Sequence, residues 1–447
     1  MPINSFLYPG PTNSNPYQVA NSCRFESGDT AYLTRTCGST ASSYTVSMWV
    51  KTANSSGTAT SALWWNASNS KLNWELNDHG QFYYYDSGTP RTTGYYRDVS
   101  AWYHVVFKVS SNTGTLYING AAAAGLTGIG SIASLVSGNS LQIGGDNGGS
   151  TFDGYMSEVC FIDGTALNPD QFGEFDEDSG IWKPIDVSGL TFGTNGFYLD
   201  FQDSSALGND VSGNNNDLTA NNLTATDQST DTCTNNFATL NPLVPYSSAT
   251  FSEGNLKIVS QTYASIVSTI AVSKGKWYAE MRSTDISAGT AFMGITSNLP
   301  TASNYEAYNQ SGEIVGYGVA GNGSAYGNGG GFGSWGGWDN NAIIMMAVDL
   351  DNNKLYWGVD GTWGNSSNPS TNTNGGSITS ASSTAQGVYW FFCNSQTGDN
   401  ATLEYNFGSP PYAISSGNAD GNGYGNFEFA VPSSYYSLCT KNLSEYG

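Results

Sequence analysis

Acidic side chains alternate in the run Glu174-Phe175-Asp176-Glu177-Asp178. If this run formed a strand, Glu174, Asp176 and Asp178 would share one face, because alternate residues of a strand point to the same side. Two carboxylates flanking a glycosidic bond are the usual machinery for its hydrolysis. The run lies after the strands expected in the first part of the chain and is followed by a Ser-Gly pair. We therefore favour a solvated acidic edge without catalysis, and keep a glycoside hydrolase as the alternative.

Histidine is scarce, since the sequence contains His79 and His104 and no other. The chain therefore has too few histidines to favour a Ser-His-Asp triad or a histidine-based metal site. His104 lies in the middle of an expected strand, where a packing role is predicted, and His79 lies in an expected turn. The six cysteines show neither a CxxC pair nor any other metal-ligand spacing, which indicates small buried side chains. The sequence therefore predicts no enzyme.

Aromatic residues make up 13% of the chain, and some could form a platform on which a sugar ring stacks. The glycine-rich segment 316–338, which we expect to form a loop, contains Tyr326, Phe332, Trp335 and Trp338. We predict ligand contact at these four residues, with packing of their rings over a sheet as the alternative. Further candidates in the first part of the chain are Trp64, Trp65, Trp74, Tyr83, Tyr84 and Tyr85. Because consecutive strand residues point to opposite faces, at least one of the three tyrosines is expected at the surface.

The charge balance narrows the class of partner. With 14 basic and 36 acidic residues among 447, the formal net charge is −22. Nucleic acids and anionic membranes attract basic surfaces, so neither is expected as a partner. The N-terminus has no basic and apolar signal pattern, and no apolar run approaches the length of a membrane span. We expect a protein made in a cytoplasm that does not insert into membranes.

The elements that must position these residues are strands. Runs of four to eight alternating or continuous apolar residues recur between Gly, Asn, Asp and Ser, without helical periodicity. This pattern predicts an all-β protein of two antiparallel sandwiches of the jelly-roll type. The expected organisation is a sandwich with an N-terminal extension over residues 1–186, a polar connector over 187–250, and a second sandwich with a C-terminal extension over 251–447.

Three segments of the first half carry four sequence elements in the order found in one known module. They are WYHVVFKVSSNTGTLYINGA (Trp102 to Ala121), SLQIGGD (Ser140 to Asp146) and FDGYMSEVCFIDGTAL (Phe152 to Leu167), the first of which contains both a Trp-x-His-Val strand and a Leu-Tyr-x-Asn-Gly hairpin. Together they resemble a laminin-G-like module of the concanavalin-A-like lectin/glucanase superfamily. The resemblance covers roughly residues 20 to 167 and implies a sandwich with one concave sheet. The same superfamily includes hydrolases with alternating carboxylates, and the run at Glu174 resembles their pattern incompletely.

The second half resembles another module. AIIMMAVDLDNNKLYWGVDGTW (Ala342 to Trp363) resembles the core hairpin of a SPRY domain, and KWYAEMRS (Lys276 to Ser283) and AFMGITS (Ala291 to Ser297) fit its earlier strands. The joining segments, such as FGEFDEDSGIWKP (Phe172 to Pro184) and DTCTNNFATLNPL (Asp231 to Leu243), are similar to those of structural proteins of tailed phages that infect marine bacteria.

These resemblances together imply a phage virion surface protein, which could be a tail fibre, an appendage or a capsid decoration. Its implied role is assembly and adhesion to host-surface glycans, with other virion proteins as partners and with a homo-oligomeric form. Release by cell lysis would account for the missing signal peptide. A free lectin is a further alternative.

Calcium is the candidate cofactor, because laminin-G-like modules often bind it through loop carboxylates and carbonyl groups. The residues that would hold it are Asp29, Asp146 and Asn147, the last two within Gly-Gly-Asp-Asn-Gly-Gly. The alternative is turn formation, for which Asp and Asn are well suited.

Overall fold

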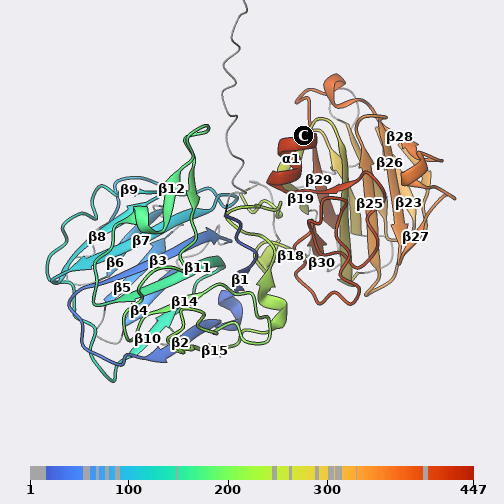
Figure 1. Cartoon of the computed structure of the whole chain (residues 1–447). Coiled ribbons are helices and arrows are strands. Elements are labelled where there is room, and N and C mark those ends of the chain that lie inside the picture. The colour runs from blue at the N-terminus through green and yellow to red at the C-terminus, as the bar shows by residue number, and fades with distance from the viewer. Residues whose placement is uncertain are drawn as a thin grey trace, which may run out of the picture.

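The computed structural model describes residues 17–53, 61–66, 70–75, 80–85, 91–146, 149–243, 249–260, 264–286, 291–300, 307, 315–328, 330–395 and 401–447. They form two β-sandwiches that lie side by side (Figure 1). Within these ranges a single α-helix occurs, α1 (Thr440–Tyr446), and no helix there is long and apolar enough to cross a membrane. The prediction of an all-β, two-sandwich fold is confirmed.

The first sandwich consists of two antiparallel sheets, which we call the β3 sheet and the β4 sheet. The β3 sheet has the order β16 (Gln228–Ser229), β1 (Ser22–Phe25), β11 (Gly154–Asp163), β3 (Tyr44–Thr52), β7 (Tyr103–Ser110), β8 (Thr113–Ile118), β9 (Ala121–Ala122), with β14 (Phe197–Leu199) also on β11. The β4 sheet has the order β15 (Thr219–Asn221), β2 (Tyr32–Thr36), β10 (Ser140–Ile143), β4 (Ser61–Asn66), β5 (Ser70–Glu75), β6 (Gln81–Tyr85). The hairpin β12 (Gly173–Phe175) and β13 (Trp182–Pro184) projects from this sandwich (Figure 1).

Central strands of the β3 sheet are buried on both faces. Every residue of β3 is buried, as are nine of the ten residues of β11. One face contributes to the core between the two sheets, with Tyr44, Val46 and Met48. The other face is covered by residues 165–196, whose Phe172 and Phe192 pack on the β3 sheet. On the outer face of the β4 sheet, Thr219 and Tyr85 are exposed, whereas Asn73, Gln142 and Tyr83 are buried.

The second sandwich also has two sheets. One has the order β17 (Thr250–Ser252), β18 (Lys257–Ser260), β30 (Ala401–Asn406), β20 (Lys276–Asp285), β25 (Ile343–Asp349), β26 (Lys354–Val359), β27 (Thr362–Trp363), with β28 (Gly376–Ser377) on β26 and β31 (Tyr436–Ser437) parallel to β20. The other has the order β19 (Ala264–Val272), β29 (Tyr389–Ser395), β21 (Ala291–Thr296), β22 (Gly316–Ala320), β23 (Ser324–Gly327), β24 (Gly330–Ser334). Short 3-10 turns complete the chain: η1 (Ser27–Asp29), η2 (Pro169–Gln171), η3 (Ala225–Asp227), η4 (Pro369–Thr371) and η5 (Ala381–Ser383).

The segment 187–250 contributes strands to the first sandwich. β14 pairs with β11, β15 pairs with β2 at the edge of the β4 sheet, and β16 pairs with β1. The segment also reaches the core of that sandwich through Leu207 and Leu218, and its Asp231 forms a buried ion pair with Lys51 of β3 at 2.7 Å. The polar residues of this segment therefore shape the first sandwich as well as joining it to the second.

Candidate functional site

The outer face of the β4 sheet carries polar and aromatic side chains in a row across the strands. Strand pairing aligns one residue from each strand: Thr219, Thr34, Gln142, Trp65, Lys71 and Tyr85, in the order of the sheet. Their chain neighbours Trp64, Leu72 and Tyr84 point inward and are buried in the core. Alternation along each strand thus sends apolar residues inward and this row outward. We call these six residues the β4 row.

Lys71 fixes the end of the β4 row at which Tyr85 lies. Its Nζ lies 2.6 Å from Oδ2 of Asp146 and 4.6 Å from the centre of the Tyr85 ring. Asp146 is only 6% exposed, and its other carboxylate oxygen accepts a hydrogen bond from the backbone amide of Ser150. An ammonium group over an aromatic face is attracted by the ring electrons. The ion pair and the ring contact therefore fix these side chains beside Trp65, which pairs with Lys71 in the sheet.

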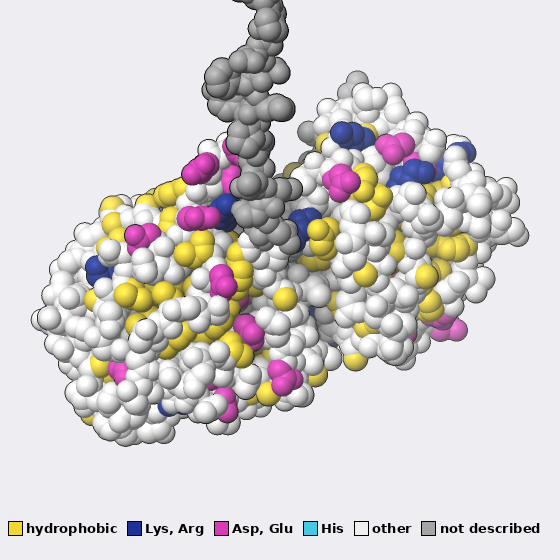
Figure 2. Space-filling view, viewed as in Figure 1, with side chains coloured by type: hydrophobic (Ala, Val, Ile, Leu, Met, Phe, Trp, Pro, Cys, Tyr) yellow, Lys and Arg dark blue, Asp and Glu magenta, His cyan; other side chains and the backbone are white. Residues whose placement is uncertain are grey.

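This arrangement suits an uncharged, hydroxyl-rich ligand with flat apolar faces. Tyr85 is 46% exposed and Trp65 is half-buried, so both rings are accessible from solvent. The charges of Lys71 and Asp146 are matched to each other, so the face has no excess charge there to attract an ion. Binding sites of this kind combine aromatic surface with a few polar groups that fix orientation. Figure 2 shows the same character more widely, since charged side chains are scattered singly over a largely uncharged surface.

A hydroxyl-lined pocket lies at the β15 end of the row. Its volume is about 440 Å³, and it is lined by Thr34, Arg35, Thr36, Ser140, Asp217 and Thr219. Thr34 and Thr219 belong to the β4 row, so the pocket continues that face.

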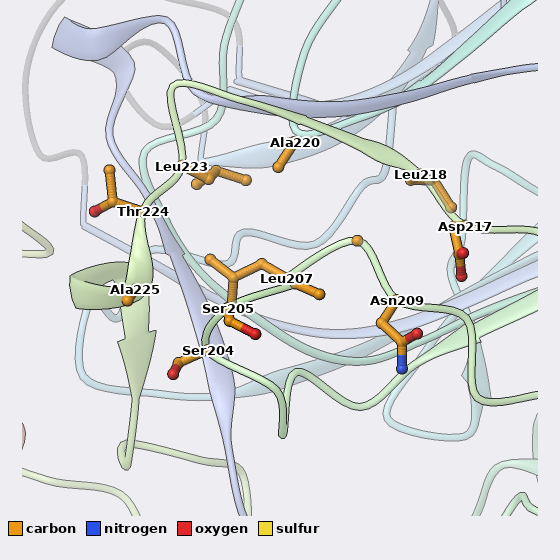
Figure 3. A pocket seen from close by; sticks show the side chains of 12 residues that line it. Ser204, Ser205, Leu207, Asn209, Asp217, Leu218, Ala220, Leu223, Thr224 and Ala225 are labelled. Atoms are coloured by element: carbon orange, nitrogen blue, oxygen red, sulfur yellow. The ribbon is translucent and has the colours of Figure 1, made fainter.

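A second pocket lies between β15, η3 and the loop 204–209. It has a volume of about 430 Å³, and Figure 3 shows that its lining comes from the segments 204–209 and 217–225. Leu207, Leu218 and Leu223 provide its apolar surface, and Asp217 borders both pockets.

The four aromatic residues predicted as a binding loop lie in the second sandwich. Trp335 and Trp338 are 3% and 5% exposed and belong to its core. Phe332 packs against the Tyr317 ring, with ring centres 5.0 Å apart, and Tyr326 packs against Phe292. The placement of the two tryptophans matches the packing alternative, because their rings are turned away from solvent. Ligand contact at these residues stays a prediction.

The residues predicted to bind calcium do not form a fitting ligand set. Calcium requires six to eight oxygen ligands. Asp146 is paired with Lys71, Asp29 is exposed in η1, and Asn147 lies outside the described residues. Across the described ranges, no group of three or more His, Cys, Asp or Glu side chains could hold a metal ion.

The alternating acids lie on the projecting β12–β13 hairpin and the turn that closes it. Lys183 forms ion pairs with Glu174 at 3.3 Å and with Asp176 at 3.2 Å. Hydrogen bonds from the backbone and side chain of Ser179 lower the pKa of Asp176 to about 2. Asp176 is therefore ionised at neutral pH and paired with Lys183. Asp178 is exposed.

His104 is buried at the base of the same hairpin. Trp182 donates a hydrogen bond from Nε1 to Nδ1 of His104 at 2.9 Å, so the ring proton lies on Nε2, which is 2.9 Å from Oγ of Ser47. The Trp49 ring stacks on the imidazole with ring centres 4.8 Å apart. Burial lowers the pKa of His104 to about 3. The histidine is a neutral packing residue, as its place in the strand predicted, and His79 lies outside the described residues.

Sequence reasoning found part of the β4 row and missed the rest. Trp65 and Tyr85 were among the candidate aromatic residues, and Tyr85 meets the expectation that one of three tyrosines is exposed. Trp64, Trp74 and Tyr84 are core residues. Lys71, Gln142 and Thr219 were not singled out. The alternation of inward and outward residues along each strand shows that these three side chains could point outward. Which strands lie side by side depends on the strand order of the sheet, and a single sequence does not reveal that order.

Comparison with known proteins places the first sandwich. Residues 26–171 match the family model described as the concanavalin A-like lectin/glucanases superfamily. The first sandwich is therefore a concanavalin A-like domain, as the laminin-G resemblance implied. No curated protein matches the chain.

Solved structures with similar folds include a heptameric SAP-like pentraxin from Limulus polyphemus, at 15% identity and a TM-score of 0.29, covering 35% of this chain and 81% of that one. The SPRY domain of human HERC1 is similar at 9% identity and a TM-score of 0.26, covering 34% and 87%. Domain 4 of AbnA, an extracellular arabinanase from Geobacillus stearothermophilus solved with arabinotriose, is similar at 22% identity and a TM-score of 0.24, covering 30% and 65%.

Proposed function

We propose that this protein binds glycans without cleaving them, through the outer face of the β4 sheet. The observation that carries the proposal is the contact set of Trp65, Lys71 and Tyr85 on adjacent strands. It offers two solvent-accessible rings and a fixed charged pair. The match of this domain to a superfamily of lectins and glucanases supports the same class of ligand.

We further propose that the glycan belongs to a bacterial host surface and that the protein is a virion surface component, either a tail fibre, an appendage or a capsid decoration. The support is the resemblance of the joining segments, such as Phe172 to Pro184, to those of phage structural proteins. Mass spectrometry of purified phage particles tests this part. Peptides of the protein are expected in the particles, and their absence from intact particles would refute the virion role while leaving glycan binding to be judged separately.

A glycan array tests the binding face. The wild-type protein and the variants Trp65→Ala and Tyr85→Ala are compared with Phe175→Ala, which removes a 57% exposed ring on the β12–β13 hairpin. The wild type and Phe175→Ala are expected to bind the same glycans, and both row variants are expected to lose at least about tenfold in affinity. Equal binding by all four proteins, or binding by none, would contradict the proposal.

If the protein were a glycoside hydrolase, it would release products from a bound polysaccharide, and the variant Glu174→Gln would no longer release them. Glu174 is exposed and its partner Lys183 is shared with Asp176. We expect no reducing ends to form during long incubation of the wild type with any glycan it binds. Cleavage that Glu174→Gln abolishes would establish the alternative.

A further inference from the structure

A buried lysine of the first sandwich faces an asparagine side chain of the segment 187–250. Nζ of Lys51 on β3 donates at 2.7 Å to Oδ1 of Asn236. The same Nζ donates at 2.7 Å to Oδ2 of Asp231 and at 3.3 Å to the backbone oxygen of Phe237. The side chains of Lys51 and Asp231 are each only 1% exposed, and lysine is among the residue types least often buried. The cluster thus brings an amine, a carboxylate and a carboxamide into direct contact.

The amine and the carboxamide are placed for reaction with each other. The carbon Cγ of Asn236 is bonded to Oδ1 at about 1.2 Å, so Nζ of Lys51 lies within about 3.9 Å of that carbon. Reacting atoms in productive geometries lie about 3–3.5 Å apart, so a small movement suffices. Nδ2 of Asn236 donates to the backbone oxygen of Ser100 at 2.6 Å. This hydrogen bond fixes the carboxamide with its oxygen toward the lysine.

Asp231 is held as a proton acceptor for the amine. Its Oδ1 accepts hydrogen bonds from Nε1 of Trp102 at 3.0 Å and from the backbone amide of Phe237 at 3.3 Å, while Oδ2 faces Nζ of Lys51. The centre of the Tyr155 ring lies 5.6 Å from Nζ, and this ring packs against Trp102. Because the amine and the carboxylate are buried beside these rings, little water reaches the cluster to hydrolyse the carboxamide instead.

We propose that Lys51 and Asn236 condense into an intramolecular isopeptide bond, with Asp231 as the acid–base group. One proton moves from Nζ to Oδ2 of Asp231, and the lone pair of the neutral amine forms a bond to Cγ of Asn236. The bond between Cγ and Nδ2 then breaks, and its electron pair leaves with Nδ2. Nδ2 takes up the proton from Asp231 and a second proton from Nζ, so that ammonium departs and Asp231 is ionised again. The reaction needs no oxidant or co-reactant, and it is independent of glycan binding.

The bond would join the first sandwich to the segment 187–250 where that segment meets the end of the chain. The amide of Asn236 donates to Oγ1 of Thr440 at 3.0 Å, and the amide of Thr440, the first residue of α1, donates to the backbone oxygen of Asn236 at 2.9 Å. The crosslink therefore fixes beside β3 the residue on which the start of α1 is held. A covalent crosslink also stabilises the folded state by restricting the unfolded chain.

Mass spectrometry of the full-length protein, purified and kept at neutral pH, tests the proposal. The wild type is expected to be lighter than its sequence mass by one ammonia, and a protease digest is expected to contain a branched peptide that joins residue 51 to residue 236. Asn236→Ala removes the carboxamide, keeps the pair of Lys51 with Asp231, and is expected to have its full sequence mass. Asp231→Asn keeps the shape of the site without the proton acceptor, and its digest is expected to lack the branch between residues 51 and 236.

A second reaction that releases ammonia must be separated from this one. An Asn-Gly pair can cyclise to a succinimide with the same loss of mass, and the chain contains such pairs, among them Asn119-Gly120. Lys51→Met prevents the isopeptide bond and leaves succinimides unaffected, so its full sequence mass is expected. Lys183→Met, which removes a partly exposed lysine of the β12–β13 hairpin, is the matched control and is expected to lose ammonia like the wild type.

Circular dichroism checks that each variant is folded, and Asn236→Ala decides the test if the buried substitution Lys51→Met prevents folding. A wild type with its full sequence mass would overturn the proposal. An ammonia loss that persists in Asn236→Ala, without a branched peptide in the wild type, would overturn it as well. The same branched peptide at wild-type yield in Asp231→Asn would refute the acid–base role of Asp231.

Discussion

Lys71 contacts Asp146 and Tyr85 and pairs with Trp65 in the sheet. Its contribution to stability and its contribution to glycan binding can be measured separately. Its ammonium group neutralises Asp146, which is almost buried, and lies over the Tyr85 ring. Without Lys71, the Asp146 carboxylate would remain desolvated and would lack the cation that offsets the free-energy cost of its burial. The position of the Tyr85 ring therefore depends on a charge pair rather than on packing alone.

The variant Lys71→Met is expected to lower the free energy of unfolding by about 1–3 kcal/mol and to weaken glycan binding. Thermal unfolding and calorimetry measure the two effects. The double variant Lys71→Met with Asp146→Asn is expected to regain part of the stability, because the unpaired charge is removed, without regaining the affinity. If the double variant is less stable than Lys71→Met, Asp146 does not depend on Lys71.

His104 is predicted to remain neutral far below the usual pKa of histidine. Burial lowers its pKa to about 3, and the hydrogen bond from Trp182 requires an unprotonated Nδ1. Nitrogen-15 NMR of labelled protein is expected to show one histidine as the Nε2–H tautomer at every pH from 8 to 5. A titration midpoint near 6.5 for both histidines would contradict the buried network.

At the scale of elements, alternation predicted most long strands closely, because each presents one apolar face to a core. Gln81–Tyr85, Ala291–Thr296, Lys354–Val359 and Ala401–Asn406 are strands of this kind. The strands β15 and β16 were missed as strands because they are two or three residues long and polar. Their extended state depends on pairing with strands far away in sequence, which no local pattern records.

The glycine-rich segment 316–338 was expected to be a loop, and that expectation was wrong over most of its length. It forms the strands β22, β23 and β24, and its glycines allow close approach between strands and rings. A Cβ on Gly327 would lie 2.3 Å from the Tyr317 ring. Glycine here is a packing requirement of a sheet, and composition alone does not distinguish that from a flexible loop.

Substitution of Gly294 in β21 tests whether glycine is required for the packing of neighbouring strands. A Cβ at this position would lie 1.9 Å from the backbone oxygen of Tyr317 on the neighbouring strand. Gly294→Ala is expected to lower the free energy of unfolding of the second sandwich by about 2–3 kcal/mol, since backbone must shift. Gly331→Ala, at a β24 position with open space around the added carbon, is the control and is expected to change little. Equal unfolding temperatures for both variants would contradict the described packing of β21 and β22.

At the scale of the whole molecule, the two sandwiches meet at a joint rich in carboxylates. Arg24 forms an ion pair with Glu253 at 3.0 Å, and the Glu253 amide donates to Oε2 of Glu26 at 2.7 Å. Tyr155 of the first sandwich donates to the backbone oxygen of Gly254 at 2.9 Å. Burial, together with the nearby charge of Glu26, raises the pKa of Asp153 to about 8. Glu26, Asp153 and Glu253 therefore make the surroundings of Arg24 at the joint locally acidic.

The raised pKa of Asp153 at this joint predicts that the stability of the folded protein depends on pH. Between about pH 4 and pH 8, folded Asp153 binds a proton that the unfolded chain does not bind, so its contribution to stability decreases as the pH rises through this window. Asp153→Asn is expected to unfold like the wild type at pH 5 and at a higher temperature at pH 9. The exposed Glu177→Gln serves as the control and is expected to match the wild type at both pH values. A variant less stable than the wild type at pH 9 would contradict the raised pKa.

The central claim is that the protein binds a glycan on the outer face of the β4 sheet. Hydrogen–deuterium exchange of the protein with and without a bound glycan tests this claim most directly. Because bound ligand protects the backbone it covers, slower exchange is expected in β2, β10, β4, β5 and β6, which form that face. No change is expected in β22 to β24, where Trp335 and Trp338 pack nearby. Protection confined to residues 316–338, with none in the β4 sheet, would contradict the claim.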